Sequence, residues 1–92
     1  MKVLIVDDEP LARDRLKRML SSIGECRVVG EACNGEQALS MAGEISPDLV
    51  FMDVRMPGMD GLAAAQYLAE IEPPPAVIFC TAYDDYAVEA FS

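Results

Sequence analysis

The chain of 92 residues is long enough for one domain at most, and its hydrophobic content of 52% excludes an intrinsically disordered protein. A net charge of −9 argues against nucleic-acid binding by this chain, because phosphate neutralisation requires clustered Lys and Arg, and it suits a site that gathers cations. No apolar run approaches the roughly 18 residues of a membrane-spanning helix, so we expect a cytoplasmic protein with no membrane partner.

The first strand and helix are predicted at the N-terminus. The apolar run 3–6 is typical of a buried strand, and it ends at Asp7 and Asp8. Apolar side chains then recur at helical spacing over residues 11–23, with basic residues on the other side. Pro10 suits the first position of that helix. This unit therefore predicts a strand whose carboxyl end carries two acids.

The second unit is weaker. Residues 26–32 predict a strand that Gly30 interrupts. Asn34 and Gly35 are expected to open a second helix. Ser46 and the proline after it end that helix. The pattern again predicts a strand followed by a helix.

Two further strands follow. Residues 48–53 predict a third strand that ends at Asp53, and residues 76–81 predict a fourth. The helix that starts after Gly61 is expected to bury four apolar side chains: Leu62, Ala65, Leu68 and Ala69. Residues 84–91 predict the start of a fourth helix, where the 92 residues end.

Alternation of near-continuous apolar strands with helices predicts an α/β fold, in which helices cover both faces of a parallel sheet. We expect a flavodoxin-like doubly wound parallel sheet of order 2-1-3-4, which makes the first and third strands neighbours where the winding reverses. No repeat, low-complexity segment or internal linker is present. Residues 1–92 are therefore expected to form one domain, which is incomplete and ends in the fourth helix.

Three carboxylates are expected at one edge of this sheet. Asp7, Asp8 and Asp53 follow the carboxyl ends of the first and third strands, which meet at the reversal. Asp7 or Asp8 alone could be a helix cap, and Asp53 alone could begin a turn. Together the three charges repel one another, and burial makes each costlier. A hard divalent cation such as Mg²⁺ compensates them best.

Other residues fit chemistry at the same edge. The hydroxyl of Thr81 is expected to face the crevice, because Thr81 ends the fourth strand, and Ala82 leaves space beside it. The turn 57–61 holds the loop after Asp53 close, and Arg55 offers its backbone carbonyl to a metal. The alternatives are an ordinary β-branched strand end at position 81 and a simple turn at 57–61.

These residues resemble a known family. The pair Asp7-Asp8, Asp53 before an Arg-Met-Pro-Gly-Met-Asp-Gly turn, and Thr81-Ala82 together resemble the receiver domain of bacterial response regulators. The resemblance covers essentially the whole chain. Within the family, the stretches DDEPLAR and FCTAYDDYAVEAF are similar to the LytTR-type transcription regulators, which include the alginate regulator.

The resemblance implies a role for each matched residue. Asp53 is the phosphoacceptor that takes a phosphoryl group from a sensor histidine kinase, and Thr81 supplies the switch hydroxyl. Asp7 and Asp8, with Asp53 and the carbonyl of Arg55, hold Mg²⁺. The domain is not an enzyme, although Mg²⁺-dependent self-phosphorylation from a small phosphodonor is expected. Because a carboxylate is ionised at neutral pH, its attack on phosphorus needs no general base, and the absence of His is no obstacle.

The chain departs from the family pattern at its C-terminal end. Receivers carry a fifth strand that begins with Lys, and this fifth βα unit is missing; Lys2 and Lys17 are not placed to reach Asp53. We expect a piece of a longer regulator that binds DNA through another domain. The predicted edge strand 76–80 carries no charge, which favours a homo-oligomer through that strand or by strand exchange.

Two readings compete with the phosphoacceptor. The first is an interaction or dimerisation module that cannot be phosphorylated in this form, because the Lys is absent. The second is an aspartate-nucleophile phosphatase of the dehalogenase type, with Asp7 as nucleophile and Glu9 as second acid, which leaves Asp53 unexplained. The cysteines at 26, 33 and 80 lack metal-ligand spacing and are expected to be small buried thiols.

Overall fold

The computed structural model describes residues 1–56 and 58–80. These residues form four strands and three helices in the order β1 (Lys2–Val6), α1 (Pro10–Ser21), β2 (Arg27–Ala32), α2 (Gly35–Ile45), β3 (Leu49–Asp53), α3 (Gly61–Leu68) and β4 (Ala76–Cys80). The predicted switch residue Thr81, its neighbour Ala82 and the predicted fourth helix lie outside the described residues, as does Pro57. None of the described helices has the length and apolar character that a membrane crossing requires.

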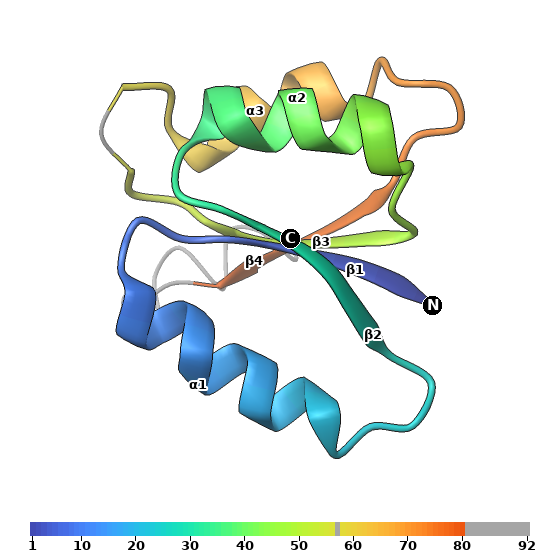
Figure 1. Cartoon of the computed structure of the whole chain (residues 1–92). Helices are drawn as coiled ribbons and strands as arrows, with labels where there is room; N and C mark the ends of the chain where they lie inside the picture. Colours follow the sequence, from blue (N-terminus) through green and yellow to red (C-terminus); the bar gives the residue numbers. More distant parts are fainter. Residues whose placement is uncertain (57, 81–92) are drawn as a thin grey trace.

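The four strands form one parallel sheet in the order β2-β1-β3-β4, as Figure 1 shows. The predicted flavodoxin-like order is confirmed. The register between β1 and β2 shifts by one residue, so that Val3 pairs with Val28 but Leu4 pairs with Gly30. A Cβ on Gly30 would lie 2.8 Å from the Cε of Met41, so α2 packs closely over β2 at the interruption predicted at Gly30.

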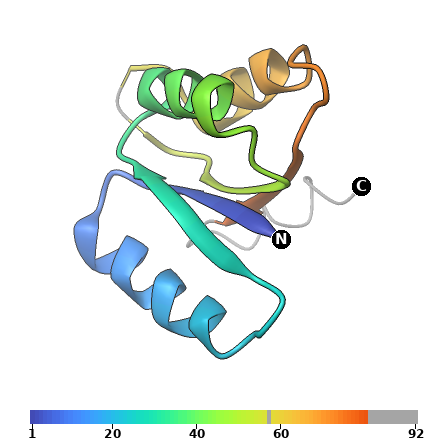
Figure 2. The ribbon, with the colours of Figure 1, turned by 45° about the vertical axis from the view of Figure 1, so that its right-hand side comes forward.

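The helices cover both faces of the sheet. Helix α1 lies on one face, and α2 and α3 lie side by side on the other (Figures 1 and 2). Side chains of β1 alternate between these layers: Val3 and Ile5 pack with Leu20 of α1, whereas Leu4 and Val6 join the larger cluster under α2 and α3. Because all four residues of this run are at most 1% exposed, β1 is the centre of the core.

The buried face of α3 matches the prediction at Leu68 but not at Leu62 or Ala69. Leu62 is 47% exposed and Ala69 is exposed, whereas Ala64 and Leu68 are fully buried. The helix starts at Gly61, which lies against the main chain that follows β3. That contact sets the rotation of the helix, so positions 61, 64 and 68 face the sheet. The thiols also differ from the prediction, since Cys33 is exposed and Cys26 and Cys80 are only half-buried.

Side chains cap α2 and α3 at the edge of the sheet where the strands end. The Oδ1 of Asn34 accepts from the N–H of Gln37 at 2.7 Å, and the side chain of Gln37 accepts in return from the N–H of Cys33 at 2.8 Å. The Oδ1 of Asp60 accepts from the N–H of Ala63 at 2.8 Å. The predicted start of the second helix at Asn34 and Gly35 is confirmed, and both helices begin at fixed points beside the carboxyl ends of the strands.

Candidate functional site

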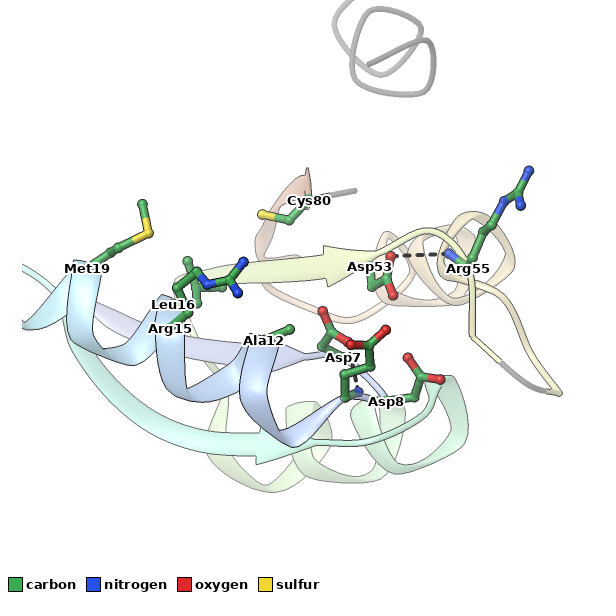
Figure 3. Close-up of a pocket in the computed structure, with 10 residues that line it drawn as sticks. Asp7, Asp8, Ala12, Arg15, Leu16, Met19, Asp53, Arg55 and Cys80 are labelled. Atoms are coloured by element: carbon green, nitrogen blue, oxygen red, sulfur yellow. Dashed lines mark hydrogen bonds between the residues drawn. The ribbon is translucent and has the colours of Figure 1, made fainter. Parts of the chain in front are cut away.

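Three carboxylates converge at the carboxyl edge of the sheet. Because Val6 of β1 pairs with Met52 of β3, the next residues, Asp7 and Asp53, lie side by side at the carboxyl edge of the sheet. One carboxylate oxygen from each of Asp7, Asp8 and Asp53 lies within 4.8 Å of the others. Figure 3 shows the three side chains directed into the same space. The structure thus brings together the acids that the strand order predicts to meet.

Asp7 forms hydrogen bonds with neighbouring main chain through both its N–H and its carboxylate. Its N–H donates to the carbonyl of Ala32 at 3.0 Å, which extends the β1–β2 ladder by one residue. Its carboxylate accepts from the N–H of Glu9 at 2.9 Å. Glu9 is the N-cap residue of α1, and its own side chain makes no capping hydrogen bond. The carboxylate of Asp7 therefore orders the loop between β1 and α1.

The guanidinium of Arg13 adds a third contact to this loop. Its Nη1 donates to the carbonyl oxygen of Asp7 at 2.7 Å, and its Nε donates to Glu31 of β2 at 3.2 Å. Sequence reasoning placed Arg13 only among the basic residues of the first helix. A cation five residues after the second acid, at the end of the first helical turn, is the signal that could have pointed to it.

The loop after β3 places Asp53. The N–H of Arg55 lies 3.4 Å from the Oδ1 of Asp53, a long and weak hydrogen bond. The guanidinium of Arg55 points away from the three carboxylates (Figure 3). The N–H of Gly61 donates to the carbonyl of Val54 at 2.9 Å. A Cβ on Gly61 would collide with the carbonyl oxygen of Asp53, so only glycine lets α3 start this close to the acid.

The environment makes the charges of the cluster costly. Partial burial and, next, the charge of Asp7 raise the pKa of Asp53 to about 6, against an ordinary value of 3.8. Burial also raises the pKa of Asp7, and the neighbouring Asp8 adds to this effect. The site therefore holds negative charge that the described surroundings compensate only in part. Carboxylate oxygens at these separations are a donor set that fits a hard divalent cation such as Mg²⁺.

A wider pocket surrounds the acids. It is lined by Asp7, Asp8, Glu9, Ala12, Arg15, Leu16, Met19, Asp53, Arg55 and Cys80. Cys80 of β4 pairs in register with Asp53. Burial, followed by the charges of Asp53 and Asp7, raises the pKa of the Cys80 thiol to about 11, so it stays protonated near neutral pH. Sequence reasoning missed this neighbour, although the predicted 2-1-3-4 order already places the end of β4 beside that of β3.

Two predicted site residues have no geometry that tests their roles. Thr81 lies outside the described residues. Arg55 is beside the cluster through its main chain, but metal coordination by its carbonyl stays a prediction. For Asp7, Asp8 and Asp53 the proximity is observed, and their roles in chemistry stay predictions as well.

Comparison with known proteins gives matches over nearly the whole chain. The family model of the response regulator receiver domain matches residues 3–92. The chain is 56% identical over 92 residues to the positive alginate biosynthesis regulatory protein of Pseudomonas aeruginosa, and 45% identical over 91 residues to the sensory transduction protein LytT of Bacillus cereus. Each match covers 99% of this chain and 37% of the relative, so the chain spans little more than a third of these proteins.

Solved structures share the fold. The response regulatory domain of mrkE from Klebsiella pneumoniae matches with a TM-score of 0.86 at 34% identity, over 99% of this chain and 75% of that one. The receiver domain of NarL from Mycobacterium tuberculosis matches with a TM-score of 0.85 at 40% identity, over 95% of this chain and 70% of that one. A chain in the CheX–CheY–BeF3–Mg²⁺ complex from Borrelia burgdorferi matches with a TM-score of 0.84 at 29% identity, over 90% of this chain and 63% of that one.

Proposed function

Since the chain belongs to the family of response regulator receiver domains, we propose that its Asp53 accepts a phosphoryl group from a sensor histidine kinase. The observation that carries this proposal is the convergence of three carboxylates within 4.8 Å at the end of β1 and β3. A doubly wound sheet binds its ligands at this edge, where the winding reverses. An acid cluster in that position is suited to a metal-assisted transfer of an anionic group.

The transfer forms one bond and breaks one bond. A carboxylate oxygen of Asp53 attacks phosphorus, the P–N bond to the phosphohistidine of the kinase breaks, and the imidazole leaves with the electron pair and takes up a proton. The product is an acyl phosphate on Asp53. Although burial raises its pKa, the value of about 6 leaves Asp53 mostly ionised above pH 7, ready to attack without a general base.

The metal part of the proposal assigns Mg²⁺ to the acid cluster. Asp7, Asp8 and Asp53 would supply carboxylate oxygens, and Arg55 its backbone carbonyl. When bound, Mg²⁺ neutralises charge that develops on the phosphoryl oxygens. The Borrelia burgdorferi complex that matches this chain contains Mg²⁺, which supports the assignment. Thr81, whose hydroxyl we propose closes on the phosphoryl group, follows β4 directly.

The output belongs to the longer proteins of the family. Because the matched relatives include transcription regulators nearly three times as long as this chain, we propose that residues 1–92 act as a receiver domain that controls a DNA-binding partner domain. Association of the chain with a second copy stays a prediction. Light scattering checks it, and a monomer at high protein concentration would contradict it.

Intact-mass spectrometry after exposure to acetyl phosphate tests the phosphoacceptor. We expect a gain of one phosphoryl group that requires Mg²⁺ and is absent in Asp53→Asn. Glu44→Gln is a matched control, because it removes one exposed negative charge at the opposite end of α2 from the site. A folded protein that gains no mass with Mg²⁺ present would overturn the proposal and favour an interaction module.

A further inference from the structure

Arg13 joins two elements that flank the acid cluster. From α1 it reaches the carbonyl oxygen of Asp7 with Nη1 and Glu31 of β2 with Nε, at 2.7 and 3.2 Å. Its side chain is only 19% exposed. A guanidinium offers several donors in one rigid plane, so a single side chain can satisfy both acceptors at once and fix their relative position.

The hydrogen bond from Arg13 reaches Asp7 where the main chain leaves the sheet. After the bond from Asp7 N–H to Ala32, the chain leaves the sheet and turns within three residues into α1. The peptide that carries the Asp7 carbonyl leads directly into Asp8. Holding that carbonyl therefore restrains the direction in which the carboxylates of Asp7 and Asp8 leave the main chain.

Anchoring of α1 to β2 does not by itself account for Arg13. Lys17, one turn further along the helix, already forms an ion pair with Glu31 at 2.9 Å, which is shorter than that of Arg13. Moreover, a cation near the N-terminus of a helix opposes the helix dipole. Arg13 lies at the end of the first turn, where that dipole disfavours a positive charge. Its distinguishing contact is the bond to Asp7.

We propose that Arg13 is a positioning residue for the acid cluster, which holds the main chain of Asp7 so that its carboxylate and that of Asp8 face Asp53. The inference deepens the function proposed above and rests on it for the identity of the ligand. Arg13 acts through Asp7 and has no contact with the metal or the phosphoryl group in this role.

A purely electrostatic role and a positioning role of Arg13 predict opposite changes in metal affinity when Arg13 is lost. A positive charge near a cation site repels the incoming cation, so its removal alone tightens metal binding. Loss of an outer contact that orients a ligand weakens metal binding, typically by 10–100-fold. The sign of the change therefore separates the two effects.

Binding of Mn²⁺, followed by the electron paramagnetic resonance signal of the free ion, provides the test. We expect Arg13→Gln to raise the dissociation constant about 10-fold. Lys17→Gln is the matched control, since it removes one positive charge and one contact to Glu31 but no contact to Asp7. It should leave the dissociation constant unchanged or lower it. Arg13→Lys restores the charge without the planar donor pair, and it should stay weaker than wild type.

Amide hydrogen exchange by NMR gives a second readout that needs no metal. The N–H of Glu9, which donates to the carboxylate of Asp7, should exchange faster in Arg13→Gln than in wild type or Lys17→Gln. Equal dissociation constants for Arg13→Gln and Lys17→Gln would overturn the inference. If Arg13→Gln does not fold, Arg13→Lys decides, and wild-type affinity in that variant would overturn it.

Failure of the proposed function has a separate signature. If wild type and Asp53→Asn bind Mn²⁺ equally, the metal site is wrong, and amide exchange alone then decides the role of Arg13. Faster exchange at Glu9 in Arg13→Gln would support positioning of the acidic loop, whereas unchanged exchange would refute it.

Discussion

Asp7 and Asp53 come from neighbouring parallel strands, and the charge of Asp7 contributes to raising the pKa of Asp53. Partial burial is the larger cause of that shift. The two carboxylates lie within 4.8 Å, together with that of Asp8. In the absence of a cation this arrangement stores repulsion, which makes it less stable as the acids ionise.

The stability of the metal-free protein should therefore fall as Asp53 ionises. Its pKa rises from 3.8 in the unfolded chain to about 6 in the folded one, so the folded state binds the proton more tightly. Stability decreases as pH rises through this interval. At pH 7.5 we expect Asp53→Asn to stabilise the metal-free protein by about 1 kcal/mol, a figure reduced for solvent screening. Below pH 4 the gain should vanish. Thermal denaturation at both pH values checks this, and equal melting temperatures at pH 7.5 would contradict it.

Mg²⁺ should stabilise the wild-type protein by mass action. At a concentration 100 times the dissociation constant, the expected gain is about 2.7 kcal/mol. Asp53→Asn should lose most of this gain, because one of three carboxylates is neutralised. Glu44→Gln should keep it. The measurement is the melting temperature across a Mg²⁺ titration, and an equal response in all three proteins would indicate non-specific binding.

Gly61→Ala should disturb the site through the main chain. The new methyl group would collide with the carbonyl of Asp53, so β3 and α3 must separate. We expect a loss of about 1–3 kcal/mol and weaker Mn²⁺ binding. In Gly43→Ala, by contrast, the Cβ meets nothing within 4 Å, and a helical Ala should stabilise by about 0.5–1 kcal/mol. Urea denaturation of both variants measures the difference.

The observed rotation of α3 predicts that truncating Leu68 and truncating Leu62 lower the stability by different amounts. Leu68 is fully buried in the cluster under α2 and α3, so Leu68→Ala should cost about 2–5 kcal/mol. Leu62 is 47% exposed, so Leu62→Ala should change the stability by about 0.5 kcal/mol or less. Chemical denaturation of the two variants checks the assignment. Comparable losses would place Leu62 in the core.

The thiols should differ in reactivity towards a disulfide reagent at pH 8. Cys33 is exposed, whereas burial and the nearby acids raise the pKa of the half-buried Cys80 to about 11. Since the thiolate is the reactive form, Cys33 should react first. Cys33→Ser should remove the fast phase. A fast phase that survives this substitution and disappears in Cys80→Ser would contradict the prediction.

Much of the architecture follows from local pattern. The apolar run before Asp7, the helix start at Asn34 and the strand order together predicted the sheet and the meeting of Asp7 with Asp53, because parallel strands end at the same edge. The buried face of α3 followed only at Leu68. An alanine-rich helix offers weak periodicity, and the close approach of Gly61 to the chain after β3 sets the rotation.

Arg13 shows a second reason why the site was only partly predictable. Its spacing along α1 indicates a basic face, and this pattern is correct for Lys17 as well. What distinguishes the two is which helix position lies beside the end of β2 and the loop after β1. The register shift between β1 and β2, which places Glu31 opposite Ile5, sets that alignment. Spacing within the helix does not separate Arg13 from Lys17, and only the short distance of Arg13 from the acidic pair along the chain does.

The contact between Gly61 and the chain after Asp53 also has a mechanical consequence. Gly61 donates to Val54 at 2.9 Å and has no free space beneath it, so this peptide and the start of α3 are held together. The eight-residue helix α3 is about 12 Å long. A small tilt of α3 at the acid cluster would therefore give a larger displacement at the far end of the helix, near Tyr67. That ring is 55% exposed, and with Tyr83 and Tyr86 replaced by Phe its fluorescence would report the tilt from outside the site.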